Sequence, residues 1–147
     1  MALHKVLLLV EHGEGLLARH RIELRTAGLD QPCRITGDDE QLQLAITNLL
    51  RNAAEAIAEA EMKTGEISIE LSVKGEDAEL VIGDSGPGWP EDGPADIPLT
   101  TTKKGGTGIG LYVVRTAMEN HRGEITFGRS PLGGAEVRLR FPRVEKA

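Results

Sequence analysis

Two asparagines, Asn48 and Asn52, stand four residues apart in a segment whose apolar residues recur at helical spacing. Their side-chain amides therefore share one face of a predicted helix. Asparagine competes with a helix for backbone hydrogen bonds, so two of them in mid-helix suggest a specific task. Neutral carbonyl oxygens suit Mg²⁺, which completes its shell with water and substrate phosphates. The alternative interpretation is a solvated helix face.

A carboxylate, Asp84, directly follows an apolar strand-like segment and is followed in turn by Gly86 and Gly88. A carboxylate at that place can accept a hydrogen bond from an exocyclic amine, which would select adenine over guanine. The glycines let the backbone turn sharply and approach a ligand closely. The alternative is an ordinary Asp-Ser-Gly turn.

A glycine-rich segment, residues 103–111, opens a second predicted helix. Its glycines expose successive N–H groups, and the helix N-terminus adds the positive end of a dipole. Thr107 can cap the helix, and Lys103 and Lys104 supply positive charge. The segment predicts a phosphate cradle. It matches neither the Walker pattern nor the dinucleotide fingerprint, which needs glycine where Leu111 stands.

The elements that position these residues begin with a predicted helix reaching about residue 19. Short strands are expected at 21–26 and 33–36, around a turn. The asparagine helix follows, with Asp38 or Asp39 as its N-cap. Glycine suits a helix C-terminus, so this helix is expected to end near 64–65.

Strand patterns dominate the rest of the chain. A hairpin turning at residues 75–77 joins strands at 67–73 and 80–82, and the aperiodic stretch 84–107 is typical of a functional loop. A helix at 108–121 and a closing hairpin with strands at 124–128 and 135–141, turning at 131–134, complete the chain. Strands and helices without strict alternation predict an α+β fold, an antiparallel-rich sheet with helices on one face.

Composition limits the function classes. The 147 residues predict a single domain, 1–147, and carry a net charge of −6 with no basic stripe, so no nucleic-acid partner is expected. The longest apolar run, residues 6–10, is far short of a membrane span, and no signal peptide is recognisable. A single cysteine, Cys33, fits a reducing compartment. We expect a cytoplasmic domain without direct membrane contact, monomeric in isolation.

The order and spacing of the three motifs resemble the GHKL, or Bergerat, ATP-binding fold of sensor histidine kinases. Residues 48–53 resemble the N box, 84–88 the G1 box and 106–111 the G2 box, and 101–103 resemble the lid segment before it. The resemblance runs from about residue 21 to residue 142, and 48–56 is closest to the nitrogen-regulation-like class. It implies an α/β sandwich with a mixed, mostly antiparallel sheet and a mobile ATP lid at about 89–106.

The resemblance implies ATP and Mg²⁺ as cofactors and a role for each matching residue. Asn52, helped by Asn48, would hold Mg²⁺. Asp84 would bond the adenine amino group, with Gly86 and Gly88 shaping its pocket. Lys103 or Lys104 would neutralise the γ-phosphate, and Asn48 and Lys103 would be the catalytic pair. The remaining nucleotide-binding residues are Gly106, Thr107, Gly108, Ile109, Gly110 and Leu111, the last also a candidate adenine wall together with Ile57 and Ile82.

The residue at position 48 separates two activities of this fold. Its ATPases carry a water-activating glutamate there, whereas an amide such as Asn48 cannot act as a general base. Transfer to a histidine needs less base assistance, because imidazole is already a nucleophile. The prediction is therefore a kinase that donates the γ-phosphate of ATP to a histidine. The alternative is a regulatory module that binds ATP or ADP and transfers nothing.

None of the four histidines lies in the acceptor motif of that family; His121, for example, is followed by Arg122. We therefore expect the phosphoacceptor histidine on a separate dimerisation domain that this chain lacks, with a response regulator downstream. The lid also lacks the family's phenylalanines near Pro98. Trp89 is expected either to replace that aromatic anchor or only to end the turn after Gly88.

Overall fold

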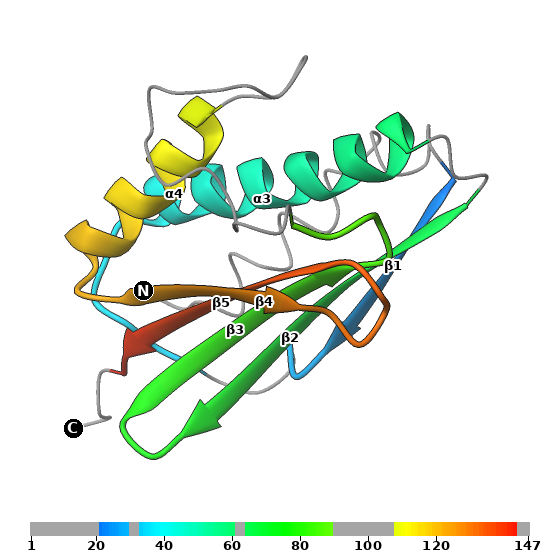
Figure 1. Cartoon of the computed structure of the whole chain (residues 1–147). Helices are drawn as coiled ribbons and strands as arrows, with labels where there is room; N and C mark the ends of the chain where they lie inside the picture. The colour runs from blue at the N-terminus through cyan, green and yellow to red at the C-terminus, as the bar shows by residue number, and fades with distance from the viewer. Residues whose placement is uncertain (1–20, 30–32, 61–63, 90–107, 144–147) are drawn as a thin grey trace.

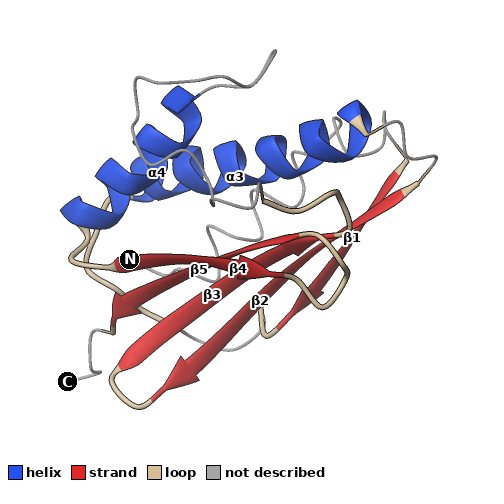
Figure 2. Ribbon diagram, viewed as in Figure 1, coloured by secondary structure: helices blue, strands red, loops and turns tan. Residues whose placement is uncertain are grey.

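The computed structural model describes residues 21–29, 33–60, 64–89 and 108–143. These described residues form two layers, a five-stranded sheet and two helices that cover one of its faces (Figure 1 and Figure 2). In chain order the elements are β1 (Ile22–Ala27), α3 (Asp39–Glu59), β2 (Gly65–Lys74), β3 (Asp77–Asp84), α4 (Gly108–Asn120), β4 (Glu124–Arg129) and β5 (Ala135–Pro142). The predicted opening helix lies outside the described residues.

The sheet has the strand order β1-β2-β3-β5-β4. β1 pairs with β2 in parallel, and the other three pairings are antiparallel, which confirms the mixed, mostly antiparallel sheet. β3 is the central strand, so its last residue, Asp84, emerges from the middle of the sheet. The end of β3 is flanked by β2 on one side and by β5 on the other.

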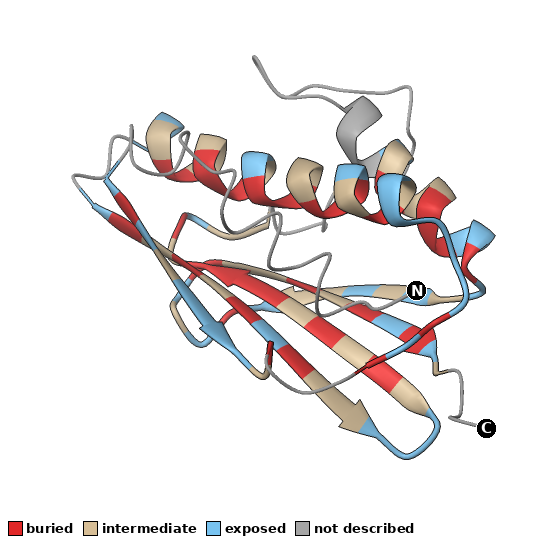
Figure 3. Ribbon diagram, turned by 180° about the vertical axis from the view of Figure 1, so that it is seen from behind, coloured by how far each residue is buried: buried red, intermediate tan, exposed pale blue. Residues whose placement is uncertain are grey.

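The core lies between the helices and one face of the sheet (Figure 3). Side chains alternate along a strand, and Ile67, Ile69 and Leu71 of β2 are buried while Glu70 is exposed. α3 contributes an apolar stripe that includes Leu42, Ile46, Leu49, Leu50 and Ile57. The aliphatic core follows directly from a sequence with few aromatic residues.

The N-terminus of α3 is capped by Asp38, one of the two predicted candidates. Its carboxylate accepts hydrogen bonds from the backbone N–H groups of Glu40, at 2.9 Å, and Gln41, at 3.3 Å. The predicted C-terminus near 64–65 is wrong, because the helix ends at Glu59 and Gly65 begins β2. A Cβ at Gly65 would lie 2.7 Å from a methyl carbon of Ile57. Glycine therefore serves close strand–helix packing there and not helix capping.

The second predicted strand, 33–36, is also wrong. Only Arg34 forms an isolated bridge, and β1 takes its ladder from β2 instead. Cys33 and Ile35 are each 1% exposed, so the apolar alternation anchors this connection to the core without making a ladder. Burial raises the pKa of the Cys33 thiol, against the opposing effect of Arg143.

α4 ends in a Schellman motif. The N–H of Gly123 donates to the carbonyl of Met118 at 2.8 Å, and that of Arg122 donates to Glu119 at 3.2 Å. Arg122 has φ of 56°, the left-handed conformation that this motif requires. His121, just before it, is 5% exposed. The end of α4 is thereby turned directly into β4.

His121 ties the end of α4 to the start of α3. Its Nε2 accepts a hydrogen bond from the N–H of Asp38 at 2.9 Å, so Nδ1 carries the proton and donates to the carbonyl of Ala117 at 2.7 Å. A Cβ at Gly37 would lie 2.0 Å from the ring. His121 is thus a packing residue.

Replacing His121 with alanine is expected to lower the free energy of unfolding by about 2 kcal/mol, because it leaves the Asp38 N–H unsatisfied and opens a cavity. Urea unfolding followed by circular dichroism measures this change. Glu119→Ala, an exposed position near the same helix end, is the control and should shift stability by less than about 0.5 kcal/mol. Equal stability of His121→Ala and the parent would contradict the linking role.

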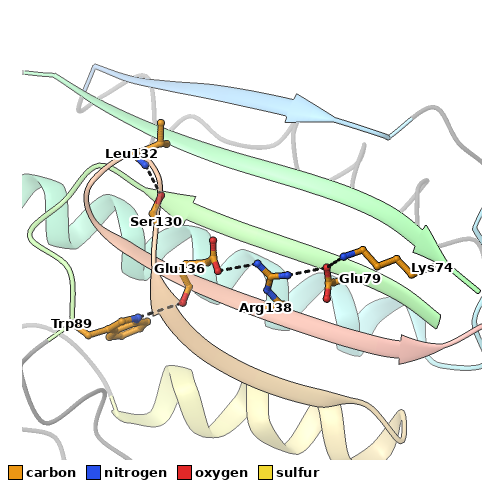
Figure 4. A network of polar contacts seen from close by, with 7 residues as sticks. All are labelled: Lys74, Glu79, Trp89, Ser130, Leu132, Glu136 and Arg138. Atoms are coloured by element: carbon orange, nitrogen blue, oxygen red, sulfur yellow. Dashed lines mark hydrogen bonds and ion pairs between the residues drawn. The ribbon is translucent and has the colours of Figure 1, made fainter.

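The face of the sheet opposite the helices carries a row of ion pairs (Figure 4). Arg138 of β5 lies 3.0 Å from Glu79 of β3 and 3.2 Å from Glu136, and Lys74 lies 3.0 Å from the same Glu79. Burial opposes the ionisation of Glu79, but Lys74 and Arg138 outweigh it and hold the pKa of this carboxyl below its usual range. The ion pairs therefore favour folding where Glu79 is ionised.

Glu79→Gln is expected to cost up to about 1 kcal/mol at pH 7, since both cationic partners remain partly solvated. A lowered pKa in the folded state gives stability that is present above the ordinary carboxyl pKa and is lost as the pH falls through the folded value. The difference between variant and parent should therefore shrink as the pH falls below the ordinary carboxyl pKa of about 4.3, and it disappears once the pH is below the folded pKa. Urea midpoints at pH 7 and pH 3 test this. Glu70→Gln, on the exposed side of β2, serves as the control.

Candidate functional site

Asn48 and Asn52 lie one turn apart on α3, as their spacing predicts, and both are half-buried. The side-chain amide of Asn48 donates to the carbonyl of Leu44 at 2.9 Å, which fixes its orientation. This bond uses the amide nitrogen and leaves the carbonyl oxygen as the atom that suits a cation. The buried neighbours Leu49 and Ala53 hold this side of the helix against the core.

Asp84 ends β3 on the sheet face that the helices cover, and it is only 5% exposed. Its Oδ1 accepts hydrogen bonds from the N–H of Gly86 at 2.8 Å and from that of Ala135 at 3.1 Å. The bond to Gly86, two residues on, forms an Asx turn. The ordinary Asp-Ser-Gly turn, which the sequence offered as the alternative, is therefore present as well. The carboxylate is therefore held in place by main-chain donors.

Gly86 and Gly88 bring the segment after β3 against its neighbours. A Cβ at Gly86 would lie 3.1 Å from Oδ1 of Asp84 and 3.5 Å from Ile57 of α3. Gly88 has φ of +87°, where glycine is favoured. Ala56, one turn beyond Asn52, lies 3.7 Å from the same Cβ position at Gly86. The structure thus brings the asparagine helix and the Asp84 segment together.

The candidate adenine-wall residues Ile57 and Ile82 are 0% and 2% exposed and belong to the core. α4 begins at Gly108, as predicted, and packs over α3 (Figure 1). Its first turn contains the backbone of Gly108, Ile109, Gly110 and Leu111. Lys103, Lys104, Gly106, Thr107 and the rest of the predicted lid after Trp89 lie outside the described residues.

Trp89, the only tryptophan, closes the described part of the Asp84 segment. Its indole N–H donates to the carbonyl of Glu136 at 3.3 Å (Figure 4), and its ring packs edge-on against Phe127 with centroids 5.3 Å apart. Both partners belong to the β4–β5 hairpin. Trp89 therefore holds this segment against β4 and β5.

Gly134 and Ala135 are the neighbours of Asp84 that the sequence interpretation missed. The N–H of Gly134 donates to the main-chain carbonyl of Asp84 at 3.0 Å, beside the bond from Ala135. The sequence predicts a turn there, and its only further signal is the adjacent pair Gly133 and Gly134.

A family model described as "Histidine kinase-, DNA gyrase B-, and HSP90-like ATPase" (HATPase_c) matches residues 37–145, which include both asparagines, Asp84 and the start of α4. The chain belongs to the HATPase_c family. Within the described parts of this HATPase_c domain, no helix is long and apolar enough to cross a membrane.

Several curated relatives of this HATPase_c domain are named as sensor histidine kinases. Sporulation kinase A of Bacillus subtilis (strain 168) is 32% identical over 124 residues, 83% of this chain and 20% of that protein. Nitrogen regulation protein NtrY of Azorhizobium caulinodans is 38% identical over 108 residues, 69% of this chain and 14% of that protein. The second match confirms the resemblance to the nitrogen-regulation class. The chain spans a fifth or less of the length of these relatives.

Solved structures confirm the GHKL fold of this HATPase_c domain. The mycobacterial sensor histidine kinase MprB has a TM-score of 0.79 at 23% identity, covering 97% of this chain and 95% of that one. ShkA, solved in complex with AMPPNP, has a TM-score of 0.81 at 23% identity, covering 100% of this chain and 31% of that one. Both structures therefore share the fold of the HATPase_c domain of this chain.

Proposed function

We propose that this domain binds Mg-ATP and donates the γ-phosphate to a histidine on a separate dimerisation domain of the same kinase. The observation that carries the proposal is Asp84, a nearly buried carboxylate held by main-chain donors beside the asparagine helix. Burying a carboxylate costs free energy unless hydrogen-bond donors compensate for the lost water, and Gly86 and Ala135 supply such donors here. A fixed acceptor at this place suits an exocyclic amine, as adenine has and guanine lacks at the corresponding ring position.

Asn48 and Asn52 fit a Mg²⁺ ion, because amide oxygens are hard, neutral ligands and a nucleotide supplies the phosphate oxygens. The Asn48–Leu44 bond supports this assignment, since it employs the end of the amide that cannot bind a cation. A bound Mg²⁺ would neutralise charge on the phosphates. Asn48 and Asn52 contribute by holding the ion at one fixed side of α3.

The start of α4 is the proposed phosphate site. The backbone N–H groups of a helix's first turn have no partner within the helix and point along the axis, where they can bind anions. Gly108 and Gly110 lie in this turn. We assign Gly106 and Thr107 to the same cradle and Lys103 or Lys104 to the γ-phosphate, on the order of the motifs along the chain.

Transfer in this scheme needs position more than base catalysis. An imidazole nitrogen of the acceptor attacks the γ-phosphorus, the bond to the β–γ bridging oxygen breaks, and ADP leaves. Asn48 cannot activate water as a general base, which favours a histidine acceptor over hydrolysis. A response regulator would take the phosphoryl group next. We further propose a single, monomeric domain that works in the cytoplasm, where ATP is supplied.

Titration calorimetry of this chain with ADP, with and without Mg²⁺, tests the proposal. We expect micromolar binding that is tighter with Mg²⁺, and a parallel change in Trp89 fluorescence. Transfer is tested by adding ³²P-labelled ATP and a relative's dimerisation domain that carries the acceptor histidine. Nucleotide binding without transfer to any acceptor would favour the regulatory module, and a folded chain that binds neither ADP nor ATP would overturn the proposal.

A further inference from the structure

The turn between β4 and β5, residues 130–135, is a closed unit of its own. The N–H of Ser130 donates to the carbonyl of Gly134 at 2.8 Å, and the N–H of Gly133 donates to the carbonyl of Ser130 at 2.9 Å. The Ser130 hydroxyl, which is buried, accepts from the N–H of Leu132 at 3.0 Å (Figure 4). These bonds give the turn a fixed shape without help from Asp84.

This closed turn presents two of its N–H groups to Asp84. Gly134 donates to the main-chain carbonyl at 3.0 Å, and Ala135 donates to Oδ1 at 3.1 Å. With the donor from Gly86, the turn fixes both the backbone and the side chain of Asp84. The direction of the carboxylate is therefore set by a segment about fifty residues further along the chain.

Gly134 leaves no space for any side chain. A Cβ there would lie 2.2 Å from Oδ1 of Asp84 and 2.6 Å from both its main-chain oxygen and the nitrogen of Gly86. Two of these three neighbours are backbone atoms, which cannot rotate away. The φ angle of Gly134 is negative, whereas that of Gly133 is +105°. Position 134 therefore requires glycine because a side chain would collide with Asp84, and not because of its backbone conformation.

We propose that Gly134 is a positioning residue for nucleotide specificity, which it sets by holding the Asp84 carboxylate in the direction that accepts the adenine amine. This role rests on the function proposed above. Specificity of this kind depends on a fixed acceptor, because a carboxylate that can turn or take up water discriminates less between amine and carbonyl ligands. A methyl group at position 134 would push the turn away and release Oδ1 from Ala135.

Titrations with ADP and GDP of the parent, Gly134→Ala and Gly128→Ala test the role. Gly128 is the matched control, because it lies in the same hairpin and its added Cβ would meet only Glu136 at 3.7 Å. We expect the parent and Gly128→Ala to prefer ADP, and Gly134→Ala to lose at least about tenfold of that preference. A purely structural role would lower both affinities together, so an unchanged ADP-to-GDP ratio in Gly134→Ala would overturn the proposal.

A second measurement does not require Gly134→Ala to fold. In a ¹H–¹⁵N spectrum, Asp84→Asn should shift the amide resonances of Gly134 and Ala135 and leave that of Gly128 in place. Unmoved resonances would overturn the proposed contact. If the parent bound neither nucleotide, the proposed function and the specificity role would both fail, whereas ADP binding with an unchanged ratio in Gly134→Ala would refute the role of Gly134 alone.

Discussion

Asp84→Asn is expected to weaken ADP binding by about 100-fold or more, close to 3 kcal/mol. The asparagine oxygen can still accept from Gly86 and Ala135, so the fold around it should persist. Its amide nitrogen, however, puts a donor where the carboxylate has an acceptor, so this amide and the adenine amine would face each other as two donors. Titration calorimetry of the parent and the variant measures the loss.

The control for this variant is Asp77→Asn. Asp77 begins the same strand, β3, at the opposite end of the sheet from Asp84. The substitution removes the same charge, and ADP should bind as it does to the parent. Asp84→Asn with parent-like affinity would show that adenine is recognised elsewhere, even if ATP binding itself were confirmed.

Phe141→Ala is expected to produce the largest loss of stability, about 3–5 kcal/mol. Phe141 is 0% exposed and lies edge-on to His121, with ring centroids 6.4 Å apart. Its removal opens a cavity under the end of α4. Small domains are typically stable by about 5–15 kcal/mol, so the variant should unfold well below the parent's melting temperature.

The same variant separates stability from binding. Phe141 pairs with Ala78 on β3, whereas Glu136 pairs with Gly83, beside Asp84. The cavity therefore lies at the end of the sheet away from Asp84, and the folded fraction at low temperature should retain parent-like ADP affinity. Leu44→Ala, which truncates a side chain that is 54% exposed, is the control and should melt like the parent. A parent-like melting temperature for Phe141→Ala would contradict its place in the core.

The sequence predicted the parts of the structure that local patterns determine. The helical spacing around Asn48 and Asn52 placed both amides on α3, and the residue types before it limited the cap to Asp38 or Asp39, of which Asp38 is the cap. Alternation located β2, β3 and the closing hairpin. Family membership then confirmed what the three motifs indicate in combination.

The errors concern contacts between distant segments. Residues 33–36 show strand-like alternation, but the ladder of β1 is formed with β2, in parallel. Gly65 resembles a helix cap in sequence, and only its contact with Ile57 explains it. Gly134 is similar, because its need for glycine arises from Asp84, far earlier in the chain. No local propensity carries such information.

The central place of β3 has a consequence for how the chain folds. β2 and β3 are neighbours in sequence and can form their hairpin early, whereas β3 meets β5 only after a long loop has closed. Pairing across that separation is slow, because its entropy is lost before the contacts compensate for it. The bond from Ala135 to Asp84 spans 51 residues and forms in that same late event. We therefore expect a refolding chain to regain helical circular dichroism before it regains nucleotide affinity.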